Sequence, residues 1–318
     1  GVRSRCEAGR FHQIAMAMFD VSVIIASVES ARSIGRCVES VRAALEGKCS
    51  EEIVVDASRD TSADIAERGF GHAVVVIRCA PGTLTPELWA IGIRRSTGRV
   101  IALTTGHFEV GRAWLENLES ALRAGHTGAA GRLDLADATS VTDWAVFYLR
   151  YSEFLQEPKE VWRGVPGIPA DNAAYDGEAI RQFVMNSDDG FWEVEFHRQL
   201  HAAGGSLAVV PGATAHYARS FPFSTIARHR FHHGRHAGAW RVSRVGRSPA
   251  MIVAGTPLVP FALALRAWRR VHSMVEHRGR FLRALPAFLV LAGCWAVGEA
   301  VGAIGGAPAP SRPVPRPA

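Results

Sequence analysis

Three polar positions in the first third of the chain directly follow short apolar runs. Ser27 follows VSVIIA, Asp56 follows EIVV, and the turn 104–107 follows VIAL. Ligands of parallel α/β sheets bind beyond the carboxyl ends of the strands, so these three positions are the first candidates for a binding site. Polar residues also end strands for no functional reason, but three in the same register favour a ligand site.

A pair of glutamates offers acid–base chemistry later in the chain. Glu193 and Glu195 lie in WEVEFHRQL, within a segment 191–205 that places Phe196, Leu200 and Ala203 on one helical face. A carboxylate within hydrogen-bond reach of a hydroxyl can act as a general base. The alternative is an ordinary amphipathic helix with solvated glutamates.

The elements that would position these residues are predicted from apolar patterning. Four short, largely β-branched runs, at 21–26, 52–55, 73–77 and 100–103, alternate with helical patterns such as 84–95 and 114–123. This alternation predicts an α/β fold with a mostly parallel sheet, flanking helices and right-handed crossovers.

Composition is that of a folded and basic protein. Of 318 residues, 48% are hydrophobic and 21% charged, which excludes wholesale disorder. The net charge of +6 is carried almost entirely by arginine, since Lys48 and Lys159 are the only lysines. Arginine suits phosphate and carboxylate, so anionic ligands or lipid headgroups are expected partners, with a bias in genomic composition as the alternative.

Arginine and histidine concentrate in residues 219–247, which contain no acidic residue. We expect an anion-facing surface there, with Arg228 and Arg235 as candidates for binding an anionic group such as a diphosphate. A surface for acidic lipid and a solvated basic helix are the alternatives. No nucleic-acid motif accompanies the charge, so a nucleic-acid partner is not expected.

The order of these segments, from about residue 21 to 240, resembles the inverting glycosyltransferase family 2, whose GT-A fold binds nucleotide sugars. EIVVDASRDTSADIAE is similar to the second strand and nucleotide loop of that family, IPADNAAYD to its acceptor-side segment, and GFWEVEFHRQLHAAGG to the helix with the catalytic base. The resemblance implies Glu193 as base with Glu195 nearby, and Asn172 on the acceptor side. It also implies a UDP- or GDP-sugar donor held by Ser27, Asp56, Asp60 and Thr105, although Asp60 equally suits a helix cap.

One departure from the family concerns the metal site. Where members carry Asp-x-Asp for Mg²⁺ or Mn²⁺, this chain has Thr105-Gly106-His107. Hard cations prefer oxygen ligands, so one imidazole is a poor replacement. Three alternatives follow: His107 binds a softer ion, cationic side chains neutralise the diphosphate, or donor turnover has been lost.

The C-terminal region contains two apolar stretches, 250–265 and 284–304, each near the length that spans a bilayer. An arginine-rich connection, 266–283, separates them, and Glu299 lies inside the second. Spanning would place the basic connection opposite the catalytic domain, so we expect a re-entrant or interfacial hairpin at the cytoplasmic face. A soluble helical subdomain is the alternative.

The predicted organisation is a leader at 1–19, a GT-A-like domain at 20–247, two membrane-associated segments at 248–306 and a disordered Pro-rich tail at 307–318. The predicted function is a membrane-associated glycosyltransferase of cell-envelope glycan biosynthesis, acting on a lipid-linked or glycan acceptor. The alternative is a catalytically inactive relative that serves as a binding or assembly partner at the membrane.

Overall fold

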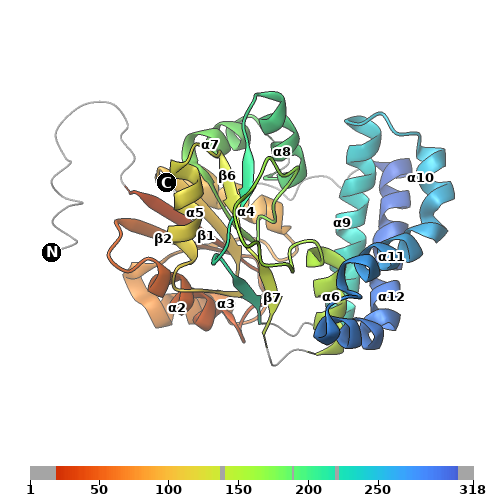
Figure 1. Cartoon of the computed structure of the whole chain (residues 1–318), viewed down its shortest axis with the longest axis horizontal. Coiled ribbons are helices and arrows are strands. Elements are labelled where there is room, and N and C mark those ends of the chain that lie inside the picture. Colours follow the sequence, from red (N-terminus) through yellow and green to blue (C-terminus); the bar gives the residue numbers. More distant parts are fainter. Residues whose placement is uncertain (1–18, 137–139, 188–189, 219–221, 307–318) are drawn as a thin grey trace. The chain divides into compact units, whose positions relative to one another are not determined.

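The structure is a computed structural model that describes residues 19–136, 140–187, 190–218 and 222–306 (Figure 1). Most of the expected leader and all of the expected Pro-rich tail lie outside the described residues. Within these ranges the chain divides into two compact units. The first comprises residues 19–134 and 156–218, and the second comprises residues 135–155 and 219–306.

The first unit is built on an eight-stranded sheet of order β3-β2-β1-β4-β9-β6-β10-β8. Four parallel strands form one half: β1 (Val21–Ser27), β2 (Ser50–Asp56), β3 (Val75–Arg78) and β4 (Val100–Thr105). The other half contains β6 (Gly128–Ala130), β8 (Trp162–Arg163), β9 (Asn172–Asp176) and β10 (Leu207–Val209), with β9 antiparallel to both β4 and β6. The predicted α/β class with a mostly parallel sheet is confirmed.

Strands β1, β2 and β4 form where β-branched runs are buried on both faces. All seven residues of β1 are buried, as expected for a central parallel strand between helical layers. The flanking helices are α2 (Ile34–Ala44), α3 (Ser62–Phe70), α4 (Thr85–Arg95), α5 (Trp114–Arg123), α7 (Gly177–Met185) and α8 (Glu193–Ala202), with a 3₁₀ turn at Gly71–Ala73.

One core cluster joins residues of α4, α7 and α8 to one face of the sheet, among them Trp89, Ile180 and Phe196. A second, three-stranded sheet contains β5 (Phe108–Val110), β11 (Ala215–Tyr217) and β7 (Leu133–Leu135). The core thus fixes α8, and with it Glu193, against the main sheet.

The second unit is helical. Its elements are α6 (Val141–Tyr151), α9 (Phe223–Ser243), α10 (Pro249–Gly255), a 3₁₀ turn at Thr256–Leu258, α11 (Val259–Val271) and α12 (Val275–Gly305). The arginine-rich stretch 266–283, expected as a connection, is helical apart from the turn at 272–274. The sequence interpretation missed this because its arginines interrupt the apolar runs without interrupting helix propensity.

Helices α9 and α12 approach so closely that only glycine fits between them. A Cβ on Gly234 or Gly238 would collide with a carbonyl oxygen of α12, and one on Gly298 or Gly302 with a carbonyl oxygen of α9. Both pairs are spaced four residues apart, the arrangement that lets two helix backbones come into contact.

Glu299 is paired within this unit. It is 2% exposed and forms an ion pair with Arg241 of α9, whose guanidinium also lies 5.5 Å from the centre of the Trp295 ring. Pairing offsets part of the cost that an isolated carboxylate would carry in an apolar helix.

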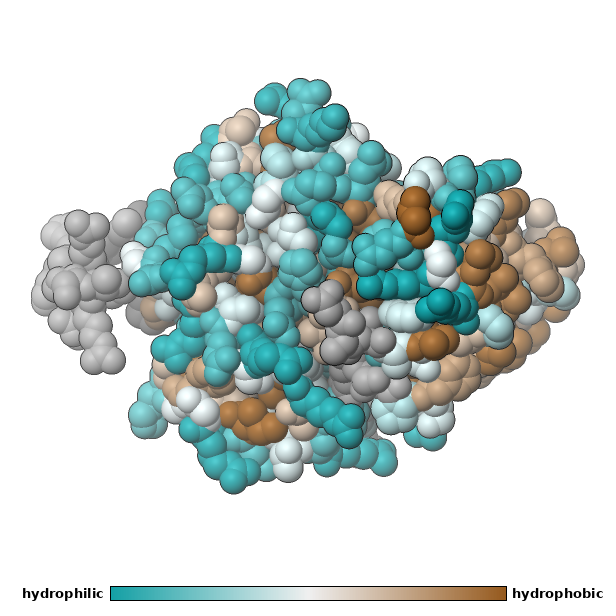
Figure 2. Space-filling model, turned by 60° about the horizontal axis from the view of Figure 1, so that its bottom comes forward, coloured by the Kyte–Doolittle hydropathy of each residue, from teal (hydrophilic) through white to brown (hydrophobic). Residues whose placement is uncertain are grey.

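Two helical segments in the described part of the chain are long and apolar enough to cross a membrane. They are Pro249–Val271, with hydropathy 1.6, and Val275–Gly305, with hydropathy 1.9; 11% of the most apolar 18-residue window is buried in the first and 44% in the second. Apolar side chains gather on the surface formed by this unit (brown in Figure 2). The first segment is therefore the more exposed of the two.

Candidate functional site

The polar ends of the central strands lie side by side at one edge of the sheet. Ser27 at the end of β1 is in register with Asp56 at the end of β2, and Ala26 is in register with Thr105 at the end of β4. The three positions singled out from the sequence are thus neighbours at the carboxyl edge, where ligands of such sheets bind.

Two loops at this edge are joined by backbone-to-side-chain hydrogen bonds. The amides of Glu29 and Ser30 donate to the hydroxyls of Ser58 and Ser62, both at 2.7 Å. Glu29 has a φ of 51°, a conformation that is uncommon for a residue other than glycine. These bonds hold the β1–α2 and β2–α3 loops as one preformed surface.

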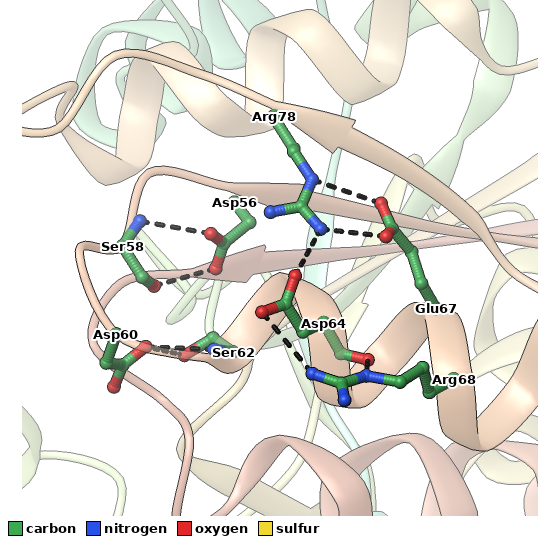
Figure 3. A network of polar contacts seen from close by, with 8 residues as sticks. All are labelled: Asp56, Ser58, Asp60, Ser62, Asp64, Glu67, Arg68 and Arg78. Atoms are coloured by element: carbon green, nitrogen blue, oxygen red, sulfur yellow. Dashed lines mark hydrogen bonds and ion pairs between the residues drawn. The ribbon is translucent and has the colours of Figure 1, made fainter.

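Asp56 is 4% exposed, and its carboxylate organises the second loop. One oxygen accepts from the amide of Ser58 at 3.1 Å, and the other accepts from the Ser58 hydroxyl at 2.7 Å (Figure 3). Each carboxylate oxygen has a second lone pair. Asp56 therefore keeps capacity to accept a hydrogen bond from a nucleobase or ribose.

Asp60 is more fully engaged. One of its oxygens accepts from the amide and the hydroxyl of Ser62, and the other accepts from the amide of Ala31 at 3.1 Å. It thus supports the first turn of α3 and fastens it to the β1–α2 loop. This arrangement matches the capping alternative more closely than direct contact with a ligand.

Arg78 links the edge strand β3 to helix α3, next to this loop (Figure 3). Its guanidinium reaches from β3 to Asp64 at 2.6 Å and Glu67 at 2.7 Å on α3. The hydrogen bond from Arg78 lowers the pKa of Asp64. All three groups are solvent-exposed, so the network orients α3 and contributes little to stability.

Two hydroxyls near the same edge have no hydrogen-bond partner among the described residues. Ser27 Oγ and Thr104 Oγ1 are both fully buried. Because Thr104 pairs with Ile25, two residues before Ser27, both side chains point to the same face of the sheet. A buried hydroxyl without a partner destabilises a fold by about 1–3 kcal/mol, and such strain gathers at functional sites.

The turn after β4 is packed onto the β1–α2 loop. A Cβ on Gly106 would lie 2.8 Å from Ser30 Oγ, and the carbonyl of Gly106 accepts from the hydroxyl of Ser33 at 2.6 Å. His107 is 8% exposed, with Nδ1 3.3 Å from Ser30 Oγ. Its imidazole is therefore held by this loop.

The residues at this turn do not fit a hard divalent cation. Thr105 and His107 provide no carboxylate, and Glu109 is paired with Arg36 at 2.6 Å. Within the described ranges, no group of three or more His, Cys, Asp or Glu residues is arranged to hold a metal ion. Mg²⁺ and Mn²⁺ prefer several oxygen ligands, which this donor set does not supply.

Strand β9 brings a second group of residues to the same edge. Because β9 runs antiparallel to β4 and Asn172 pairs with Thr104, the residues before Asn172 lie beside the turn that follows β4. Asp171, 2% exposed, is one of them. No local pattern in IPADNAAYD distinguishes Asp171; only the antiparallel pairing of β9 with β4 brings it to the edge.

Asn172 itself is occupied by protein contacts. Its Oδ1 accepts from Trp114 Nε1 at 2.6 Å, and its Nδ2 donates to the carbonyls of Arg132 and Ala213 at 2.9 Å. The side chain is fully buried. These bonds make it a clamp between segments of the first unit.

Glu193 lies at the start of α8 and reaches back toward β9. Its Oε2 accepts from the amide of Ala170 at 3.3 Å, two residues before Asn172. Glu195, by contrast, is bonded along its own helix to Arg198 at 2.6 Å and Gln199 at 2.7 Å. The structure thus brings Glu193, and not Glu195, to the segment that borders the edge.

A buried tyrosine and histidine lie behind these carboxylates. Tyr175 is hydrogen-bonded to His197 Nε2 at 3.0 Å. Burial, reinforced by the charges of Glu193 and Asp171, raises the pKa of Tyr175. Burial also lowers the pKa of His197 to about 4, so the imidazole is neutral at pH 7.

Arg228 and Arg235 lie on α9 of the second unit. Arg228 is exposed. Arg235 belongs to the close α9–α12 packing, and its Nε is buried without a hydrogen-bond partner among the described residues.

Comparison with known proteins decides the family. The profile described as Glycosyl transferase family 2 matches residues 22–183, about half of the chain, from β1 through α7. The chain belongs to glycosyltransferase family 2. No curated protein matches it. Among solved structures it is similar to one described as "Crystal Structure of a Mycobacterial Protein", at 17% identity and a TM-score of 0.49, covering 77% of this chain and 79% of that one.

As a family 2 glycosyltransferase, the chain has a domain of the kind that generally binds a nucleotide sugar and an acceptor. The match includes Ser27, Asp56 and the turn after β4, and it ends before Glu193. The expected base therefore rests on geometry and on the resemblance of α8, and not on the matched segment.

Proposed function

We propose that this glycosyltransferase moves a sugar from a nucleoside-diphosphate donor to a lipid-linked or glycan acceptor, with inversion at the anomeric carbon. The observation that carries the proposal is the contact of Glu193 with the segment before β9, at the edge that also holds Ser27 and Asp56. A carboxylate and a nucleotide-type loop at one sheet edge are what a single-displacement transfer requires.

In the proposed reaction Glu193 is the base. Its carboxylate takes the proton of the acceptor hydroxyl while that oxygen attacks the anomeric carbon. The bond from that carbon to the diphosphate oxygen breaks, and its electron pair leaves with the nucleoside diphosphate. Attack and departure occur on opposite faces, which inverts the configuration. Glu195, held by Arg198 and Gln199, has the role of orienting the first turns of α8.

We propose that the donor, a UDP- or GDP-sugar, binds across the joined β1–α2 and β2–α3 loops. Asp56 accepts from the nucleobase or ribose, Ser27 lies beside it, and Asp60 keeps the loop in shape. Thr105 and His107 border the diphosphate. Because the turn lacks the ligands of a hard cation, we assign neutralisation of the diphosphate to cationic side chains.

We propose that the enzyme works at the cytoplasmic face of the membrane in glycan biosynthesis of the cell envelope. The support is the segment from α10 to α11: only 11% of its most apolar 18-residue window is buried, and Leu258, Phe261 and Leu265 are between 50% and 69% exposed. Large exposed apolar patches mark membrane or partner surfaces. Segment α12 is covered in part by the basic helix α9, which favours an interfacial position over an independent span.

A catalytically inactive relative is the second candidate. The observation that favours it is the turn Thr105-Gly106-His107, where the imidazole is packed against Ser30 and no carboxylate is present. Such a protein would bind a nucleotide sugar without transferring it.

The test is a transfer assay on detergent-solubilised protein with a panel of UDP- and GDP-sugars and isolated membrane lipids as acceptor. Product linkage is read by NMR. Product of inverted configuration is the expected result. Retained configuration would rule out the single displacement, and tight donor binding without product from any acceptor would identify the inactive relative.

A further inference from the structure

An open groove on α11 combines arginines with apolar side chains. Its lining residues are Ala262, Leu263, Leu265, Arg266, Arg269 and Arg270, and its volume is about 590 Å³. The groove belongs to the second unit, and none of its lining residues is assigned above to the donor or to the base. Nothing in the proposed transfer reaction requires these arginines.

The arginines carry charge that is only partly neutralised. Arg270 is fixed by Glu153 of α6 at 2.7 Å and by the hydroxyl of Ser152 at 3.3 Å. Arg266 and Arg269 are exposed, and neither guanidinium forms a hydrogen bond or ion pair with any residue of the described ranges. Three guanidinium groups against one carboxylate leave a local charge of +2.

The same helical face changes from apolar to basic along its length. Leu258, Phe261 and Leu265 follow each other at helical spacing and are 69%, 65% and 50% exposed. Arg269 is four residues after Leu265 and so continues this face. The rise of 1.5 Å per residue places Arg269 about 12 Å along the axis from Phe261, a distance close to half the thickness of a bilayer's hydrocarbon core.

Basic residues in the last turn of a helix also complement its dipole. That effect accounts for the charge but not for the apolar side chains that share the face. An aqueous anion such as a nucleic acid or an acidic protein would likewise leave Phe261 and Leu265 without a partner. A phosphate attached to acyl chains would pair with the arginines and also cover the apolar side chains.

We propose that the α11 groove binds the phosphate of an anionic membrane phospholipid, with Arg266 and Arg269 as the phosphate ligands and the Leu258–Phe261–Leu265 face against the acyl chains. Arg270, tied to Glu153, sets the wall of the groove. The proposal rests on the proposed membrane association, and it adds a defined lipid site to it.

The test compares binding of the full chain to vesicles of phosphatidylcholine and to vesicles of equimolar phosphatidylcholine and phosphatidylglycerol, at physiological salt. Each cation near an anionic surface contributes about 1 kcal/mol, so Arg266→Gln/Arg269→Gln should lower the preference for the anionic vesicle about 10- to 30-fold. The matched control is Arg278→Gln/Arg283→Gln, which removes the same charge from exposed positions of α12 outside the groove. It should lower the preference less than about threefold.

Equal losses in the two double variants would mean that only bulk charge matters and would overturn the site. An unchanged preference in the groove variant would do the same. Inorganic phosphate added at constant ionic strength should leave vesicle binding intact; displacement by phosphate alone would identify a soluble anion as the occupant.

Donor turnover in detergent, measured on the same proteins, should be equal in all of them. Absence of turnover in the wild type would therefore contradict the proposed transferase activity. The vesicle-binding results would still test the lipid site on their own.

Discussion

At the scale of single residues, the candidate site depends on carboxylates that differ in how their oxygens are used. Asp60 and Glu195 are engaged in bonds that shape a loop or a helix, while Asp56 lies at the edge of the sheet and Glu193 reaches the segment that borders this edge. Substitutions of Asp60 and Glu195 are expected to affect folding. Substitutions of Asp56 and Glu193 are expected to affect donor binding and turnover.

Asp56→Asn tests the donor site. The amide keeps one acceptor oxygen, but an NH₂ group replaces the other oxygen and the negative charge is lost. The free energy of donor binding should therefore weaken by about 1.5–3 kcal/mol, or roughly 10- to 150-fold in affinity. Isothermal titration with UDP and GDP measures it. Asp64→Asn, on the exposed face of α3, is the control and should bind normally; a normal affinity for Asp56→Asn would place the nucleoside elsewhere.

His197 makes stability depend on pH. Burial lowers the pKa of its imidazole from 6.5 to about 4, so the unfolded chain binds a proton more readily. The part of the free energy of unfolding that depends on His197 is therefore complete above pH 6.5. It is lost as the pH falls toward 4, by about 3 kcal/mol in all. Chemical denaturation across that window should show stability rising with pH, with a weaker slope in His197→Gln. An identical slope in the variant would assign the effect to another group.

At the scale of elements, the sequence predicted best where burial follows a local pattern. Strands β1, β2 and β4 were placed within a few residues because β-branched runs mark strands buried on both faces. Strands β6 and β9 were missed because GAA and NAAYD carry no such pattern; they exist through pairing with their neighbours.

The same distinction explains the site. The register of Ser27 with Asp56 follows from neighbouring parallel strands and was predictable. The position of Asp171 depends on the antiparallel insertion of β9, a long-range pairing that no local pattern encodes.

The α9–α12 pair provides a test of helix packing. In Gly238→Val a side chain would collide with the carbonyl of Glu299, so the two helices must separate. Overpacking of this kind destabilises by about 1–3 kcal/mol or more. Thermal unfolding in detergent measures it, with Gly255→Val, which meets nothing, as control. Equal melting temperatures would show that the helices are not in backbone contact.

At the scale of the whole molecule, the chain combines a donor-binding α/β unit with a helical unit that exposes apolar surface. Soluble monomers rarely expose such surface without a partner. Under the proposed function, the first unit carries out the sugar chemistry and the second attaches the protein to the membrane.

Replacing Leu258, Phe261 and Leu265 together by Gln should abolish binding to phosphatidylcholine vesicles. Each buried side chain of this size contributes about 1.5–3 kcal/mol, so three account for most of the attachment. Flotation measures it, and Met185→Gln/Val194→Gln, two exposed apolar residues of the first unit, is the control. Attachment that survives the triple change would move the membrane contact to another surface.

The most direct test of the central claim is sugar transfer by Glu193→Gln compared with Glu195→Gln. Loss of a general base slows transfer about 10²–10⁴-fold, and the glutamine keeps its oxygen for the amide of Ala170, so donor affinity should be unchanged. Glu195→Gln should retain turnover within a few-fold, because that carboxylate is bonded along its own helix. Wild-type turnover in Glu193→Gln, or equal losses in the two variants, would contradict the assignment of Glu193 as the base.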